Sequence, residues 1–351
     1  MKKTFLSLAA LCTLFLTLVS CEKPDCPDCE NEGPSTLPLT IASDETKSTT
    51  ANTQEQDNTI TTVDVFVFRN TDPTSADYQK LDTYKRFAND ALEDLTLTTT
   101  TGPKTVCVIV NEHTNAFKGV TDLTKFRALV TNLKDELVGS YTMYGEIEET
   151  LGATTSVSLS VKRHISRVGV TSIKTKFAGT PYADMTLSNV KLYLVNAHAQ
   201  KVIYNNASSP ATPLVYNSTK LVGEDANATV EANLIYEPLT GTIGDTGITT
   251  PYFFYCYSNE TDDTPSCTKL VLQADLDGVT YYYPILINQE NYGYTSTNGY
   301  YGVRRNTTYS YGITVTRPGT LDPNVPLVPG SLELTINVDD WAVIPHFDKE
   351  F

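Results

Sequence analysis

Alternation between apolar and polar residues predicts that most of this chain forms β-strands. Residues 154–161 place Val157, Leu159 and Val161 on one face and serines on the other, the period-two pattern of a half-buried strand. Residues 63–68 are apolar on both faces, which is typical of a central strand. Further strand patterns cover residues 104–110, 168–174, 187–195, 251–257, 269–276, 280–287 and 309–316.

One segment has a helical pattern instead. Residues 122–138 begin with Asp122, a good N-cap, and repeat apolar side chains at helical spacing. A Gly- and Pro-containing stretch at 177–184 then indicates a domain boundary. Residues 205–250 are polar and weakly patterned, so we expect mostly loops there. The predicted fold is mainly β, with one β-sandwich over residues 48–180, flanked by the helix, and a second over residues 181–351.

The N-terminus predicts export and lipid attachment. Lys2 and Lys3 precede an apolar run at 4–19, which is short for a membrane span. The run ends in Leu-Val-Ser-Cys, which resembles a bacterial lipobox, so residues 1–20 are expected to be a signal peptide and Cys21 the lipidated residue. The alternative is an ordinary secretory signal with an unrelated cysteine. In either case we expect the remaining chain to lie outside the cytoplasm.

Composition narrows the function further. The formal net charge of −15 argues against nucleic-acid binding, which needs a basic face. The 21 Tyr and 12 Phe agree with a protein rich in sheets. None of the four His has a second ligand at metal-binding spacing, and no phosphate loop, GxSxG or HExxH motif occurs. We therefore expect no enzymatic activity, no cofactor and no metal.

The cysteines leave one disulfide open. Cys256 and Cys267 flank a polar turn between two strand patterns, and an oxidising compartment would favour a bridge across that hairpin. Two free thiols are the alternative. Cys107 lies in an apolar strand and is expected to be a small buried residue, while Cys26 and Cys29 belong to a Pro- and Asp-rich tether.

Two distant segments share one pattern. Leu37, Leu39 and Ile41 near the start alternate in the same way as the residues of a segment near the end, Leu332, Leu334, Ile336 and Val338. Each segment could lay its apolar side chains into the same groove. The alternative is two ordinary edge strands. Between residues 24 and 68 the only basic residue is Lys47, so a trypsin-like cut between Lys47 and Ser48 would release the lipid anchor and the first strand together.

These features resemble the fimbrillins of Bacteroidota, the FimA- and Mfa1-like major subunits of type V pili. The resemblance spans most of the chain, from the lipobox to the last strand pattern. The segments that carry it are residues 62–68, 106–111, 163–168, 255–261, 268–272, 282–285, 305–309 and 332–341. One departure is Lys47, where the family's cleavage site usually carries Arg, which leaves the identity of the protease open.

The resemblance implies transthyretin-like sandwiches and a mechanism of assembly. The precursor would be lipid-anchored in the outer membrane, and an Arg/Lys-specific extracellular protease would remove residues 21–47 with the first strand. The strand carrying Leu332, Leu334, Ile336 and Val338 of a neighbouring copy would replace Leu37, Leu39 and Ile41, a non-closing contact that makes a filament. Implied partners are identical subunits and accessory anchor and tip proteins, in a fimbrium serving adhesion, biofilm formation and colonisation. The alternatives are a tip or anchor subunit, or a glycan-binding surface lipoprotein.

Overall fold

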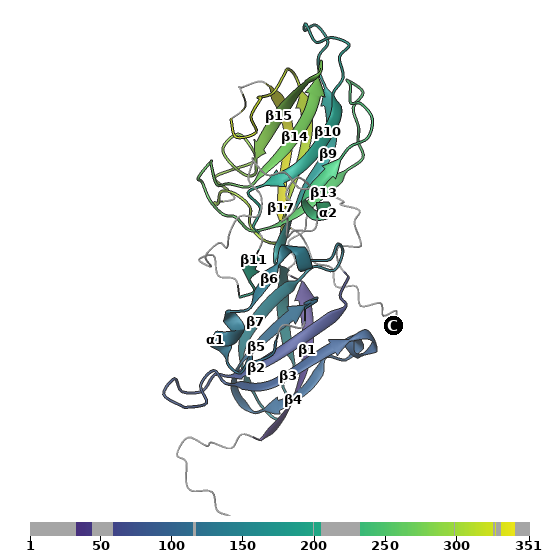
Figure 1. Cartoon of the computed structure of the whole chain (residues 1–351). Coiled ribbons are helices and arrows are strands. Elements are labelled where there is room, and N and C mark those ends of the chain that lie inside the picture. The colour runs from purple at the N-terminus through teal and green to yellow at the C-terminus, as the bar shows by residue number, and fades with distance from the viewer. Residues whose placement is uncertain are drawn as a thin grey trace, which may run out of the picture.

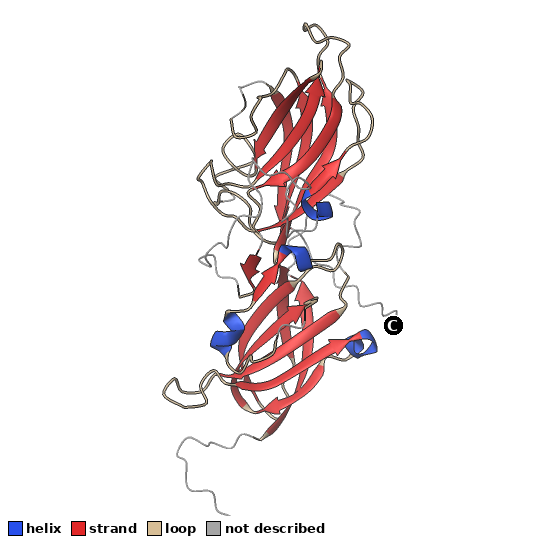
Figure 2. Ribbon diagram, viewed as in Figure 1, coloured by secondary structure: helices blue, strands red, loops and turns tan. Residues whose placement is uncertain are grey.

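The computed structural model describes residues 33–43, 59–114, 117–198, 200–204, 232–297, 299–325, 327 and 331–340. Strands are the main secondary structure of these residues, and the helices are short (Figure 2). The prediction of a mainly β protein is confirmed. Among the described residues, no helix has the length and apolar character needed to cross a bilayer.

One seven-stranded sheet forms the lower part of the molecule in Figure 1. Its strands follow one another in the spatial order β3-β2-β5-β7-β8-β1-β4. Their bounds are β1 Pro34–Ser43, β2 Thr62–Arg69, β3 Leu81–Ala88, β4 Thr96–Thr100, β5 Gly102–Val110, β7 Met143–Leu151 and β8 Val157–Arg163. A 3-10 helix, η2 Asn89–Glu93, connects β3 to β4.

This sheet curls around its own core. Only two residue pairs, Met143 with Arg163 and Tyr144 with Lys162, join β7 to β8, so the sheet turns sharply there. Val63, Val65 and Val67 of β2 face the enclosed core, while Phe66 and Phe68 face a second cluster on the outer side. Burial on both faces confirms β2 as an internal strand. The first half is thus one nearly barrel-shaped sheet rather than two separate sheets.

Two four-stranded sheets form the upper part of Figure 1 and pack face to face. Their orders are β12-β10-β14-β15 and β13-β9-β16-β17. The bounds are β9 Ile165–Thr175, β10 Ser188–Val195, β12 Tyr236–Pro238, β13 Tyr252–Tyr257, β14 Lys269–Leu276, β15 Val279–Leu286, β16 Thr307–Val315 and β17 Leu332–Asp340. Leu192 and Leu272 of one sheet and Val168 and Tyr311 of the other share a single core, as a sandwich requires.

Between β8 and β9, at His164, the chain passes from the lower sheet to the upper sheets. β8 ends at Arg163 and β9 begins at Ile165, and the described strands that pair with β9 are β13 and β16 of the upper group. The Gly- and Pro-containing stretch at 177–184 lies in the connection between β9 and β10. A small sheet links the two groups, because β11 Gln200–Val202 pairs with β6 Val130–Asn132.

The helix expected over residues 122–138 is mostly absent. Asp122 does cap a helix, accepting a hydrogen bond from the Lys125 main-chain nitrogen at 2.9 Å, but α1 spans only Leu123–Arg127. The chain then continues as β6 and a 3-10 helix, η3 Leu133–Asp135. Pairing between β6 and β11 takes over the backbone that the periodicity assigned to a helix. The only other α-helix of the described residues is α2 Ala232–Ile235, in the segment expected to be mostly loop.

Candidate functional site

Strand β1 lies between β8 and β4 and, among the described residues, is the only strand that joins them in the sheet. Its first half pairs antiparallel with β4, from Pro34 opposite Thr100 to Pro38 opposite Thr96. Its second half pairs in parallel with β8, from Leu39 opposite Val157 to Ser43 opposite Val161. The two prolines have no N–H group to donate, so β1 makes an incomplete hydrogen-bond ladder.

The apolar side chains of β1 complete the core of the seven-stranded sheet. Leu37, Leu39 and Ile41 are 0%, 8% and 3% exposed and pack within the enclosed core cluster. Thr36, which precedes these three residues, and Thr40, which lies between Leu39 and Ile41, are exposed. The three residues predicted to point into one groove therefore share a single buried face. Removing β1 from this position would open a hydrophobic groove between β8 and β4.

Strand β17, at the other end of the chain, occupies a sheet edge. Among the strands that the structure describes, it pairs antiparallel with β16 alone, from Leu332 opposite Val315 to Asp340 opposite Thr307. Its alternate residues Leu332, Leu334, Ile336 and Val338 are only partly buried where they pack against the upper core. Glu333, Thr335 and Asn337, between them, are exposed. The two segments matched by pattern thus have different surroundings: β1 is internal and its apolar face is buried, whereas β17 is an edge strand whose apolar face is only partly buried.

The residues of the predicted lipidation and cleavage lie in parts of the chain that the structure does not describe. Cys21, Lys47 and Ser48 lie outside the described residues, as do Cys26 and Cys29. Their positions in the chain still matter, because β1 ends at Ser43 and the description resumes at Thr59. Any cut between Lys47 and Ser48 would separate β1 from every later strand.

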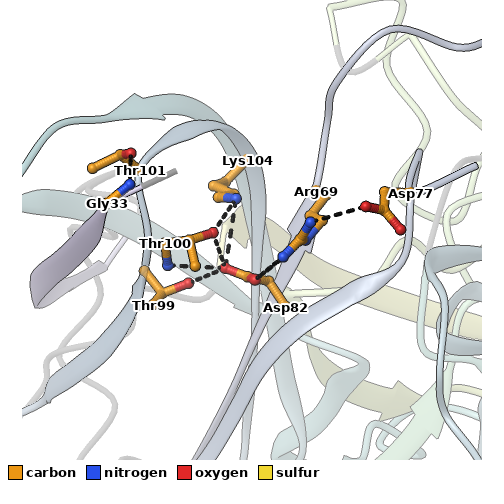
Figure 3. Close-up of polar contacts among 8 residues, drawn as sticks. All are labelled: Gly33, Arg69, Asp77, Asp82, Thr99, Thr100, Thr101 and Lys104. Atoms are coloured by element: carbon orange, nitrogen blue, oxygen red, sulfur yellow. Dashed lines mark hydrogen bonds and ion pairs between the residues drawn. The ribbon is translucent and has the colours of Figure 1, made fainter. Parts of the chain in front are cut away.

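A buried carboxylate joins the two ends of the curled sheet. Asp82 of β3 accepts hydrogen bonds on Oδ2 from Thr99 Oγ1 at 2.6 Å, from Thr100 N at 3.0 Å and from Thr100 Oγ1 at 2.8 Å (Figure 3). Both threonines belong to β4. Lys104 Nζ of β5 lies 3.5 Å from the same oxygen, and Arg69 Nη2 lies 3.2 Å from Oδ1.

The charge on Asp82 is stabilised where it lies. Its side chain is 4% exposed and that of Lys104 is 0% exposed. Burial raises the pKa of Asp82, but the hydrogen bonds from Thr99 and Thr100 and the charge of Lys104 outweigh burial and lower it to about 2. Neither Asp82 nor its partners were predicted as functional residues. The only sequence signal is a polar threonine run following an acidic residue, which indicates nothing by itself.

The cysteines differ from one expectation. Cys107 is buried in β5, as predicted, but Cys256 and Cys267 are free thiols. They do not flank a hairpin, because β13 and β14 belong to the two opposing sheets of the upper group. Cys267 Sγ instead donates to the Thr264 carbonyl at 3.2 Å. The disulfide considered for this pair is therefore not formed in the structure.

The described residues offer no arrangement suited to catalysis at a metal. No group of three or more His, Cys, Asp or Glu is placed to hold an ion in the described ranges. His164 is buried, and that burial, with the charges of Arg305 and Lys201, lowers its pKa. Tyr283 and Tyr309 are fully buried in the upper core, and Tyr281 is partly buried against it.

Comparison with known proteins points to one family. A family model described as "Major fimbrial subunit protein (FimA)" matches residues 35–231. The chain is 24% identical to the major fimbrium subunit FimC of Porphyromonas gingivalis over 95% of this chain and 69% of that protein.

Solved structures share the fold. A fimbrilin (FimA) from Porphyromonas gingivalis W83 aligns with a TM-score of 0.63 and 18% identity, covering 88% of this chain and 98% of the other. A cell adhesion protein from Bacteroides eggerthii aligns with a TM-score of 0.67 and 19% identity, covering 89% and 98%.

Proposed function

This chain belongs to the family of major fimbrial subunit proteins (FimA), and we propose from that premise that it is the repeating shaft subunit of a cell-surface fimbrium. Membership makes it a structural, non-enzymatic subunit. The finer proposal is that it is exported as a lipoprotein on Cys21, cut between Lys47 and Ser48, and polymerised by strand exchange. Accessory anchor and tip subunits and an Arg/Lys-specific protease are the further partners.

The observation that carries this proposal is the position of β1. It precedes the proposed cut, sits between two other strands and supplies three buried aliphatic side chains to a core. A removable first strand of this kind acts as a placeholder, because the groove stays closed until the strand leaves. The lipid on Cys21 and the placeholder would leave together, so release from the membrane and activation would be one event.

Strand β17 of a neighbouring copy fits the vacated groove. Its four alternate aliphatic residues would leave partly buried positions and enter a groove where the β1 side chains are at most 8% exposed. It would give up pairing with β16 on one side and regain pairing with β8 and β4. Its nine residues contain no proline, so each can donate its N–H group, unlike Pro34 and Pro38 of β1.

The contact between copies is heterologous: one copy's C-terminal strand meets another's N-terminal groove. Such a contact does not close on itself and extends into a filament. Within each subunit we propose two domains that divide at His164, the lower one built from the curled seven-stranded sheet and the upper one from the two packed sheets. The lower one would carry the groove and the upper one would carry the donor strand, so each copy would present both partners of the contact.

Limited trypsin digestion of the unlipidated chain from residue 22 tests the proposal. We expect an early cut after Lys47, followed by slow formation of a ladder of SDS-resistant multimers. Arg69 should resist, because its side chain is 25% exposed and binds Asp77 at 3.1 Å and Asp82 at 3.2 Å. Lys47→Gln is the matched control, which should stay intact and monomeric. A chain that is cut after Lys47 and yet stays monomeric at high concentration would overturn the proposal.

A further inference from the structure

Of the two strands that flank β1, β4 has the fewer backbone partners, because β8 also pairs with β7. In the sheet order β4 is the last strand, and within the described ranges β1 is the only strand that pairs with it. If β1 is removed, which rests on the function proposed above, β4 loses all five of its register pairs at once. Five residues with no sheet partner would not hold their place, so other contacts must keep β4 aligned until a new strand arrives.

Asp82 provides such a contact on the opposite edge of β4. Along a strand, successive N–H groups point to opposite sides, and Thr101 N points toward β1, where it donates to the Gly33 carbonyl at 2.9 Å. Thr100 N therefore points away from β1, and it donates to Asp82 at 3.0 Å. The carboxylate occupies the place where a neighbouring strand would accept this hydrogen bond.

The contact is built into the body of the sheet, not into the strand that leaves. Asp82 lies on β3, and Lys104 lies on β5, two strands that stay paired with β2. Lys104 Nζ also donates to Thr100 Oγ1 at 2.7 Å, so its charge holds both the carboxylate and β4. Lys85 of β3 adds an exposed hydrogen bond to the Thr96 carbonyl at 2.7 Å. None of these partners belongs to β1.

We propose that Asp82 and Lys104 form a clasp that holds β4 in register through Thr99 and Thr100 when β1 is absent. The clasp keeps the groove open and aligned for the incoming strand. Asp82 and Lys104 are positioning residues, because they touch β4 and not the donor. The clasp also ends the sheet with side chains in place of a β3–β4 ladder, so β4 stays available on the groove side only.

The sharpest variant is Thr99→Val, which removes one hydroxyl donor at nearly constant volume. Thr99→Ser restores the hydroxyl, and Thr98→Val makes the same chemical change at an exposed neighbouring residue. Asp82→Asn removes the charge but leaves Lys104 buried without it, and such a change can unfold a protein. Asp77→Asn is its control, since Asp77 binds the same Arg69 from an exposed position.

The experiment uses the chain from residue 22 with a site-specific protease sequence inserted after Lys47, so that the cut does not depend on trypsin. After cutting, the freed segment that ends at Lys47 is separated in moderate urea. The remaining chain, called the body, is returned to buffer. Binding of a labelled synthetic peptide of residues 331–340 is measured by fluorescence anisotropy. Amide hydrogen exchange of residues 96–101 is measured on the cut and uncut chains.

We expect Thr99→Val to weaken peptide binding about five- to tenfold, the value of one hydrogen bond, and Asp82→Asn to weaken it at least tenfold. Thr99→Ser, Thr98→Val and Asp77→Asn should bind like the wild type. Exchange of residues 96–101 should accelerate in the two clasp variants after the cut but little before it, because β1 still holds β4 in the uncut chain.

Equal exchange in the cut wild type and the cut Thr99→Val chain would overturn the clasp, whatever the peptide does. If the wild-type body binds no peptide while the clasp variants still accelerate exchange, the strand-exchange function fails and the clasp stands. Equal acceleration before and after the cut would also overturn the proposal, because it would make these residues general stabilisers of the fold.

Discussion

Leu37 of β1 lies opposite Leu97 of β4 in the antiparallel register, and the two side chains are 0% and 3% exposed. Each therefore buries the other against the core of the seven-stranded sheet. This pair joins β1, the first strand in the sequence, to β4, the end strand of the sheet. The loss of either side chain would expose the other. The stability of the uncut chain therefore depends on this contact between β1 and β4.

Leu37→Ala should destabilise the precursor without weakening the filament. Truncating a buried leucine costs about 2–5 kcal/mol of unfolding free energy, which urea unfolding of the uncut chain would measure. The proposed cut removes residue 37, so filaments grown from the variant should match wild-type filaments in heat and SDS resistance. Thr36→Ala, at an exposed position of the same strand, is the control. Weaker filaments from Leu37→Ala would mean that β1 remains in the assembled subunit.

Leu334→Asp should abolish polymerisation and leave the monomer folded. In the monomer, Leu334 is partly buried at a sheet edge, where a charge can reach water, so we expect a loss of about 1–3 kcal/mol. In the groove the same side chain would be fully enclosed, and an unpaired carboxylate there is far more costly. Circular dichroism would check the fold and SDS gels of the cut chain would check assembly.

Two further variants make this prediction specific. Thr335→Asp places the same charge on the exposed face of β17 and should still assemble. Deletion from Ser331 onward should block assembly as completely as Leu334→Asp. Normal multimers from either the deletion or Leu334→Asp would show that β17 is not the donor strand.

Glu136 should make the stability of the fold depend on pH. It is 3% exposed and accepts hydrogen bonds from Thr142 N at 2.9 Å and from Tyr257 Oη at 3.0 Å, which join the lower and upper groups of strands. Burial outweighs these hydrogen bonds and raises its pKa from 4.5 to about 7. Its contribution to stability is therefore present below pH 4.5 and is lost as the pH rises to about 7.

The change from this one group amounts to about 3 kcal/mol between pH 4.5 and 8. Glu136→Gln should lose this part of the pH dependence, because a neutral amide can accept from Thr142 N and donate to Tyr257 Oη at every pH. Burial also raises the pKa of Asp64, to about 6, so the difference between wild type and variant is the quantity to measure. If the unfolding free energies of the wild type and of Glu136→Gln changed equally with pH over this range, the assignment of this pH dependence to Glu136 would be contradicted.

Cys256 and Cys267 should be free thiols that are shielded from alkylation in the native protein and need no reducing agent to react once it unfolds. Both are fully buried, and burial is the main cause that raises the pKa of Cys256 to about 12 and that of Cys267 to about 11. We expect no alkylation of either residue in the native protein and full alkylation in guanidinium without prior reduction. Mass spectrometry of the peptides would report the label. If alkylation required reduction, the two residues would be bridged after all.

Whether a strand could be predicted from the sequence depended on which of its faces is buried and which residues occupy the exposed face. β8 alternates because one of its faces is buried, so Val157, Leu159 and Val161 identified it directly. β3, β4 and β7 were not predicted, because polar residues such as Lys85, Thr98 and Glu148 occupy their exposed faces and interrupt the apolar pattern. The helix pattern at 122–138 was misleading for the converse reason. Its apolar residues pack in several separate contacts instead of along one helix face. In addition, β6 pairs with β11, a strand about 70 residues further along the chain.

The residue pattern alone determined that this is a sheet protein and that its first and last strands carry equivalent apolar faces, since side-chain alternation is a local property of the chain. Only the tertiary structure decided that β1 is an internal strand and β17 an edge, and that Asp82 meets Thr99 and Thr100. Those facts follow from the way one sheet curls until its two end strands face each other. The curvature arises from packing around a shared core, which no local run of residues encodes.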